Sequence, residues 1–120
     1  MSKCILVVED QKDNRQILRD LLTNAGFEMI EAENGEDAVA SAQARRPDLI
    51  LMDIQLPILD GYEATRRIKA DPDLKSIPII VVTSYALSGD EDKARLAGCD
   101  DYVAKPFSPR QLLAKIKEHL

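Results

Sequence analysis

Two almost continuous apolar runs, each ending in acidic residues, constrain the fold of this 120-residue chain more than any other feature. Ile5 to Val8 run into Glu9 and Asp10, and Leu49 to Met52 run into Asp53. Such runs are typical of strands buried on both faces, as in a parallel sheet, whose ligands lie beyond the carboxyl ends of the strands. Three carboxylates are therefore expected at one edge. Because clustered anions destabilise one another without a cation, we expect Mg²⁺ there, with Mn²⁺ as the alternative.

Strand and helix patterns alternate five times along the chain. Apolar stretches predict strands at residues 4–8, 28–32, 48–53, 77–82 and 101–104. Helical apolar spacing follows each of them, ending near Gly26, Pro47, Ala70, Gly98 and Leu120. The last helix has the clearest start, because Ser108, Pro109 and Gln111 match a capping box. Such a (βα)5 series predicts an α/β fold with helices on both faces of a parallel sheet.

Composition narrows the class of protein. A net charge of −5, with 16 basic residues scattered among 21 acidic ones, disfavours nucleic acid, which needs clustered Lys and Arg. No apolar run approaches membrane-spanning length, and no charged leader precedes the first expected strand. Cys4 and Cys99 lack metal-ligand spacing and suit a reducing compartment. We expect one domain over residues 1–120, soluble and cytoplasmic, with neither nucleic acid nor membrane among its partners.

The ends of the later strands add polar groups to the same edge. A single aspartate after a strand usually caps the next helix or faces solvent. Here Thr83 directly follows the fourth expected strand and Lys105 the fifth, so a hydroxyl and an ammonium group join the carboxylates. Pro106 is expected to fix the direction of Lys105, and the bond between them is a candidate for the cis form. His119, the only histidine, lies in the last expected helix, so we expect neither a histidine base nor a histidine metal ligand at this edge.

These motifs resemble those of the CheY-like receiver domains of two-component response regulators. The matching segments, in family order and spacing, are Val8-Glu9-Asp10, Met52 to Pro57, Asp60-Gly61, Val82-Thr83-Ser84 and Tyr102 to Phe107. The resemblance covers essentially the whole chain. It implies a flavodoxin-like, doubly wound fold with five parallel strands in the order 2-1-3-4-5. It also implies a phosphorylated signalling protein and not a multiple-turnover enzyme.

The resemblance assigns roles to the acidic residues. Asp53 would accept a phosphoryl group from the phosphohistidine of a sensor histidine kinase or a histidine phosphotransferase. Asp10, Asp53 and the backbone carbonyl of Gln55 would bind the metal ion directly, and Glu9 would act mainly through a metal-bound water. Glu9 stands where the family more often has Asp, which lengthens the side chain by one methylene.

The resemblance also implies a route from the site to the protein surface. Lys105 and Thr83 would contact the transferred phosphoryl group through a positive charge and a hydroxyl hydrogen bond. Thr83 and Tyr102 correspond to the family's switch pair, which alters the surface of the fourth helix, fifth strand and fifth helix for a downstream protein target. The alternative for Tyr102 is an ordinary half-buried strand aromatic. Tyr85 would shield the acyl phosphate from water, so we expect slow self-dephosphorylation.

Other functions stay open at this point. The chain resembles stand-alone receivers of the CheY and DivK type, monomeric or weakly dimeric, but a receiver cut from a hybrid histidine kinase or a larger regulator would look the same. A receiver-like binding module without phosphorylation is disfavoured by Asp53, Thr83 and Lys105. A haloacid dehalogenase phosphatase would carry a second Asp where this chain has Gln55. A flavin or nucleotide carrier would offer Gly, Ser or Thr amides after the first strand, where this chain is acidic.

Overall fold

Five parallel strands and five helices alternate along the chain in the computed structural model, which describes residues 2–83 and 90–120. Their bounds are β1 Cys4–Val8, α1 Lys12–Asn24, β2 Glu28–Ala32, α2 Gly35–Arg45, β3 Leu49–Asp53, α3 Gly61–Ala70, β4 Ile79–Thr83, α4 Asp90–Ala97, β5 Asp101–Ala104 and α5 Pro109–Glu118. The strands pair in the order β2-β1-β3-β4-β5. The expected α/β fold, flavodoxin-like and doubly wound, is confirmed together with its strand order.

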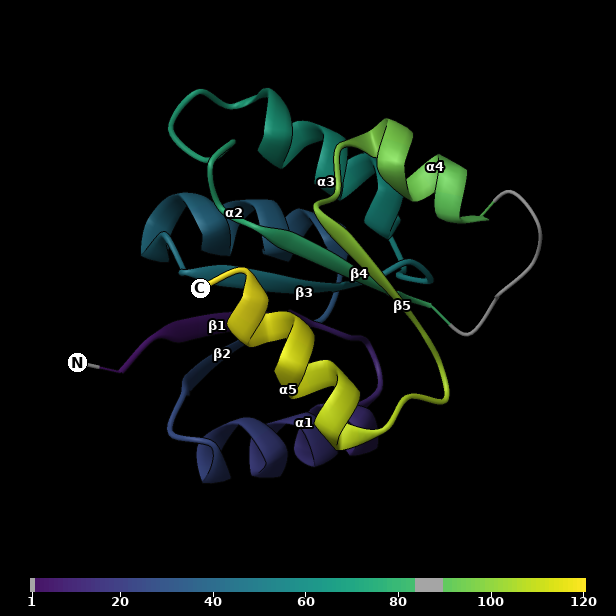
Figure 1. Cartoon of the computed structure of the whole chain (residues 1–120). Helices are drawn as coiled ribbons and strands as arrows, with labels where there is room; N and C mark the ends of the chain where they lie inside the picture. The colour runs from purple at the N-terminus through teal and green to yellow at the C-terminus, as the bar shows by residue number, and fades with distance from the viewer. Residues whose placement is uncertain (1, 84–89) are drawn as a thin grey trace.

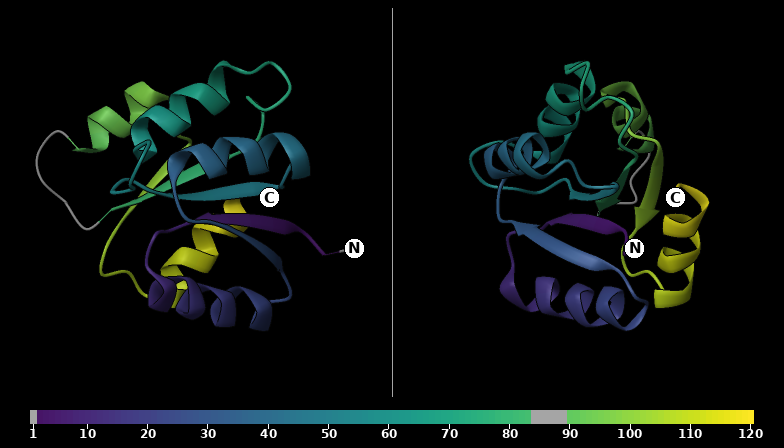
Figure 2. Two further views of the ribbon diagram at one scale, coloured as in Figure 1. Left: turned by 180° about the vertical axis from the view of Figure 1, so that it is seen from behind. Right: turned by 90° about the vertical axis from the view of Figure 1, so that its left-hand side faces the viewer.

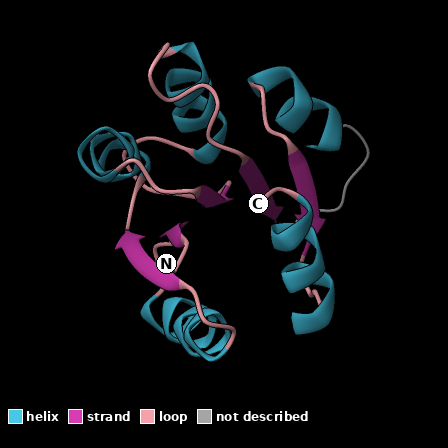
Figure 3. Cartoon of the chain, turned by 60° about the vertical axis from the view of Figure 1, so that its left-hand side comes forward, coloured by secondary structure: helices cyan, strands magenta, loops and turns pink. Residues whose placement is uncertain are grey.

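Helices cover both faces of the sheet (Figures 1 and 2). One face carries α1 and α5, the other carries α2, α3 and α4, and Figure 3 shows the helices surrounding the strands. Each face has its own buried apolar cluster, and consecutive residues of β3 alternate between them. Ile50 and Met52 pack on the side of α2, α3 and α4, whereas Leu49 and Leu51 pack on the side of α1 and α5. Because both faces are covered, the strand is apolar as far as Asp53.

Helix boundaries follow the capping residues of the sequence. The side chains of Asn34, Asp60 and Ser108 each accept a hydrogen bond from a backbone N–H three residues further on. Ser108 and Gln111 complete the expected capping box. Gly26 follows α1 with a φ of +90°, a backbone conformation that favours glycine. None of the helices in the described part of the chain is long and apolar enough to cross a membrane.

β4 begins later than the sequence predicts. We expected a strand over residues 77–82, whereas the structure has Ile79–Thr83. The N–H of Ile77 donates to the carbonyl of Leu74 in the preceding turn, and Pro78 has no N–H to donate to the sheet. The local turn therefore holds Ile77 outside the strand, while pairing with β5 continues as far as Thr83.

The strand register brings the carboxyl ends of four strands to one edge. Val8 of β1 pairs with Met52 of β3, and Asp53 pairs with Val82 of β4. Thr83 pairs with Ala104 of β5. Residues that follow these pairs lie side by side in space although they are far apart in sequence. This edge is the one for which the sequence predicted an acidic site.

Candidate functional site

Three carboxylates converge beyond β1 and β3. One ligating oxygen from each of Glu9, Asp10 and Asp53 lies within 4.8 Å of the others. Glu9 is 2% exposed and Asp53 is 9% exposed, whereas Asp10 is exposed. The acids border an open cavity of about 250 Å³, whose lining also includes Lys105 and Gln55. The predicted convergence of the three acids is thus present in the structure.

Burial and crowding act most strongly on Glu9. Burial, followed by a hydrogen bond with Asp53, raises the pKa of Glu9 to about 7. Asn14 and Lys105 act in the opposite direction. Nδ2 of Asn14 donates a 2.7 Å hydrogen bond to Glu9 Oε1, and Lys105 Nζ lies 3.7 Å from Glu9 Oε2. An anionic cluster this enclosed is suited to bind a cation. The atoms that its carboxylates offer as metal ligands are all oxygen, the ligand type that Mg²⁺ prefers.

β4 and β5 supply the cationic and hydroxyl side of the site. Lys105 Nζ lies 3.5 Å from Asp53 Oδ2 and so faces two of the three carboxylates. The backbone N–H of Lys105 donates to the carbonyl of Thr83 at 2.6 Å, which ties the ends of the two strands together. Thr83 is buried, and the bond between Lys105 and Pro106 is cis. The sequence-predicted members Lys105 and Thr83 therefore lie at the same strand edge as the acids.

The remaining predicted residues fall in different places. The backbone N–H of Gln55 lies 3.3 Å from Asp53 Oδ1, so the loop after β3 borders the phosphoacceptor candidate. Tyr102 is partly buried on β5 and packs against the apolar cluster under α2, α3 and α4. This placement suits both the expected switch and an ordinary strand aromatic. Ser84 and Tyr85, and with Tyr85 the expected shielding of an acyl phosphate, lie outside the described residues.

Arg15 and Asn14 of α1 belong to the site although the sequence reasoning did not single them out. Arg15 Nη1 donates to the backbone carbonyls of Glu9 at 3.0 Å and Asp10 at 3.2 Å. Its Nη2 lies 3.1 Å from a carboxylate oxygen of Glu33 beyond β2. One helical turn after Asp10 the chain presents an amide and a guanidinium toward the loop that carries the acids. The sequence signal that could have identified them is their position four and five residues after Asp10, because side chains in the first turn of a helix point back toward the preceding loop.

Comparisons with known proteins agree with this geometry. The family model described as "Response regulator receiver domain" matches residues 5–117. The polar-differentiation response regulator DivK of Brucella anthropi is 44% identical over 120 residues, which cover 100% of this chain and 98% of that protein. DivK of Brucella ovis is 42% identical over the same coverage.

Solved structures give the same assignment. The receiver domain of a sensor histidine kinase from Pseudomonas aeruginosa PAO1, which has a magnesium ion coordinated in the active site cleft, superposes with a TM-score of 0.92. It is 40% identical, over 98% of this chain and 97% of that one. The chemotaxis protein CheY4 of Vibrio cholerae superposes with a TM-score of 0.93 at 28% identity, over 100% of both chains. Because the family match and the fold agree over almost the whole length, the chain belongs to the response regulator receiver domains of two-component signalling and is DivK-like in sequence.

Proposed function

We propose that this receiver accepts a phosphoryl group on Asp53 from the phosphohistidine of a sensor histidine kinase or a histidine phosphotransferase. The observation that carries the proposal is the position of the Asp53 carboxylate, nearly buried between Glu9 and Lys105 and bordering the acidic cavity. An Asp53 oxygen would bond to phosphorus as the bond from phosphorus to the histidine nitrogen breaks. The imidazole leaves with the electron pair and is neutral, because its other nitrogen carries a proton.

The acidic residues would hold Mg²⁺, for which Mn²⁺ is the alternative. Asp10 and Asp53 offer carboxylate oxygens, the backbone carbonyl of Gln55 offers a third oxygen, and Glu9 would act through water. When bound, the ion offsets the negative charge of the carboxylates and of the phosphoryl oxygens. The magnesium ion in the related receiver of the Pseudomonas sensor histidine kinase supports this assignment.

Lys105 and Thr83 would stabilise the phosphorylated form. The Lys105 ammonium already faces the Asp53 and Glu9 carboxylates, so it can pair with phosphoryl oxygens added to Asp53. The Thr83 hydroxyl would donate a hydrogen bond to one of the same oxygens. The chain carries its own phosphoryl group and releases it to water, so it is not a multiple-turnover enzyme on an external substrate.

The surface of α4, β5 and α5 would report phosphorylation to a downstream protein. Thr83 ends β4 and Tyr102 lies on the adjacent strand β5, so a movement of the hydroxyl would free space for the ring. Tyr102 is half-buried, and an inward turn would change the exposed surface beside α4. We infer a monomer or weak dimer that works in the cytoplasm, where the free thiols of Cys4 and Cys99 would stay reduced.

The phosphodonor protein would dock on an apolar groove beside the acidic cavity. The groove has a volume of about 720 Å³ and is lined mainly by Ile17, Leu18, Leu21, Phe107 and Pro109, from α1 and from around the start of α5. Ile17 is 63% exposed. Asn14 and Lys105 line both the groove and the acidic cavity, so a helix seated in the groove would bring its histidine to Asp53.

Phosphorylation by a small donor tests the chemistry without the partner. The protein is incubated with acetyl phosphate and Mg²⁺, and its intact mass is compared with that of the Asp53→Asn variant. We expect the native protein to gain one phosphoryl group and the variant to gain none. A folded native protein that gains none, or a variant that gains as much, would refute the role of Asp53.

Transfer from a histidine phosphotransferase tests the groove separately. Ile17→Ala should slow transfer from the partner protein while leaving labelling by acetyl phosphate unchanged. Leu96→Ala is the matched control, because Leu96 is 85% exposed but lies on α4, away from the groove. Equal transfer rates for the native protein and Ile17→Ala would exclude the groove as the docking surface.

A receiver within a sensor histidine kinase is the second candidate function. The observation in its favour is the similarity to the Pseudomonas receiver of that kind, at 40% identity. The chemistry at Asp53 would be the same, but the phosphodonor would be a histidine of the same kinase. Sequencing of the surrounding coding region distinguishes this candidate from a stand-alone regulator.

A further inference from the structure

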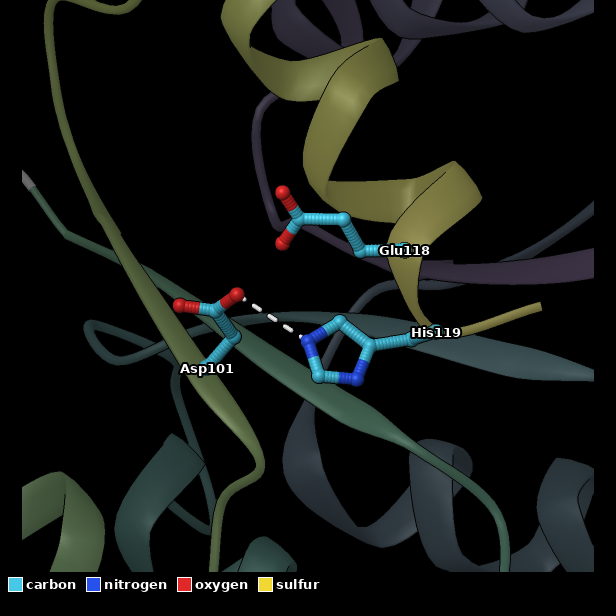
Figure 4. A group of neighbouring side chains, drawn as sticks. All are labelled: Asp101, Glu118 and His119. Atoms are coloured by element: carbon cyan, nitrogen blue, oxygen red, sulfur yellow. Dashed lines mark hydrogen bonds and ion pairs between the residues drawn. The ribbon is translucent and has the colours of Figure 1, made fainter.

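A second group of potential metal ligands lies at the other end of β5 from Lys105. Asp101 begins β5, while Glu118 and His119 lie at the carboxyl end of α5 (Figure 4). One ligating atom from each of the three side chains lies within 4.8 Å of the others. Neither the phosphoryl chemistry nor the switch uses this group of residues.

The arrangement of Asp101 leaves one carboxylate oxygen directed at the cluster. Oδ1 accepts hydrogen bonds from Lys115 Nζ at 3.0 Å and from the backbone N–H of Tyr102 at 2.8 Å. Oδ2 lies 3.0 Å from Nε2 of His119. The two contacts on Oδ1 fix the orientation of the carboxylate, so Oδ2 is held toward the imidazole.

The end of α5 allows neighbouring residues to reach the same point. His119 is the C-cap of the helix, and Figure 4 shows Glu118 and His119 both directed toward Asp101. The Asp101 and His119 side chains are 21% and 25% exposed, so solvent can reach the cluster. A helix carboxyl end also carries partial negative charge, which favours a cation there.

We propose that Asp101, Glu118 and His119 form a second cation site, which binds Zn²⁺ or a similar transition metal in preference to Mg²⁺. An imidazole nitrogen with two carboxylate oxygens is a ligand set for Zn²⁺, with water as the fourth ligand. Mg²⁺ prefers oxygen ligands alone, as in the acidic cavity. Ligands of tetrahedral Zn²⁺ lie about 3.3 Å apart, close to the spacing of Oδ2 and Nε2, and the exposed Glu118 side chain can move to complete the set.

A bound metal ion would join the last turn of α5 to the start of β5. Asp101 directly precedes Tyr102, the residue proposed to move in the switch. Zn²⁺ would therefore act on the α4, β5 and α5 surface from the opposite end to the phosphorylation site. This inference goes beyond the proposed function and does not depend on phosphorylation of Asp53.

The single histidine of the chain makes a direct test possible. The imidazole C–H resonances in the NMR spectrum belong to His119 alone, and they are followed during titration with Zn²⁺ while excess Mg²⁺ occupies the acidic cavity. We expect Zn²⁺ to shift these resonances at near-stoichiometric amounts, and Mg²⁺ alone to leave them in place. Asp101→Asn and Glu118→Gln should each weaken Zn²⁺ binding by about tenfold.

Lys115 provides a variant with the opposite expectation. Its positive charge disfavours a cation beside Asp101, and the backbone N–H of Tyr102 still orients the carboxylate without it, so Lys115→Met should strengthen Zn²⁺ binding about threefold. Thermal melts of each variant show that it is folded. Unmoved His119 resonances would overturn the proposal and leave only the hydrogen bond between His119 and Asp101. Equal Zn²⁺ affinity in the native protein, Asp101→Asn and Glu118→Gln would also overturn the proposal, because it would show that His119 binds the ion without the two carboxylates.

Discussion

The side-chain amide of Asn14 donates a 2.7 Å hydrogen bond to Oε1 of Glu9, the most buried carboxylate of the acidic site. The contact joins the first turn of α1 to the end of β1. The neighbouring Arg15 side chain donates to the backbone carbonyls of Glu9 and Asp10. Side chains of α1 therefore hold the loop that carries two of the three acids, through the Glu9 side chain and through the backbone carbonyls of Glu9 and Asp10.

Arg15→Ala should weaken Mg²⁺ binding by about tenfold, because the carbonyls of Glu9 and Asp10 lose their common donor and the acids lose their fixed direction. Calorimetric titration with Mg²⁺ measures the change. Arg19→Ala is the matched control, since Arg19 pairs with Glu31 on β2 and, among the described residues, makes no hydrogen bond or ion pair with the acidic loop. Equal weakening in both variants would show that general surface charge, and not the loop contact, is responsible.

Asp53→Asn should raise the melting temperature in metal-free buffer by about 4 °C, equivalent to about 1 kcal/mol. At about pH 8, above the raised pKa of Glu9, the substitution removes one of three clustered negative charges from a nearly buried position and keeps the size of the side chain. Thermal unfolding with and without Mg²⁺ measures the effect. The difference should shrink or reverse with Mg²⁺, because the ion stabilises the native carboxylates and binds the variant less tightly. A native protein as stable as the variant in both buffers would contradict the expected repulsion.

Gly61→Ala should destabilise the protein by about 3 kcal/mol, because a Cβ at this position would collide with the backbone carbonyl of Asp53. The start of α3 packs directly on the strand end that carries the phosphoacceptor candidate. Gly26→Ala is the comparison, since its Cβ would meet no atom within 4 Å and the cost is only that of its positive φ, about 1–2 kcal/mol. Urea unfolding ranks the two variants. The opposite ranking would mean that the loop after β3 can move away without cost.

Thr65→Val should raise the free energy of unfolding by about 1 kcal/mol. Thr65 is buried in α3, and its hydroxyl has no hydrogen-bond partner among the described residues. Valine keeps the shape of the side chain and removes the unsatisfied polar atom. Thr65→Ser, which keeps the hydroxyl and loses the methyl group, should be less stable than the native protein. A Thr65→Val variant that is less stable than the native protein in urea unfolding would contradict the prediction, because it would mean that the hydroxyl has a partner.

The Cys99 thiol should be slow to alkylate near neutral pH. Burial, and next the charge of Asp100, raise the pKa of Cys99 to about 11. In a Cys4→Ser protein, in which Cys99 is the only thiol, the rate with iodoacetamide should rise about tenfold per pH unit until the pH nears the raised pKa. The same protein unfolded in urea should react much faster at about pH 8. Equal rates for the folded and unfolded protein would contradict the raised pKa.

The fold could be predicted from local patterns because strands that are buried on both faces of a sheet are continuous apolar runs in the sequence. β1, β2 and β5 have the predicted bounds, and the capping box of α5 lies where the sequence indicated. The prediction for β4 was wrong at its start. There the backbone N–H of Ile77 bonds to the carbonyl of Leu74 in a turn, which competes with strand pairing. The apolar pattern of the sequence does not indicate this turn.

The sequence by itself determined which end of the sheet carries Glu9, Asp10, Asp53, Thr83 and Lys105, because parallel strands place their carboxyl ends on one edge. Only the tertiary structure decided how Asn14 and Arg15 hold the acidic loop and how Asp101 meets His119. These contacts depend on helix orientation and side-chain rotamers across separate elements. The hydrogen bond between Asp101 and His119 joins residues 18 positions apart through the packing of α5 on β5. The local apolar periodicity of the sequence indicates which face of each element is buried. It does not indicate which polar atoms come into contact when the elements pack together.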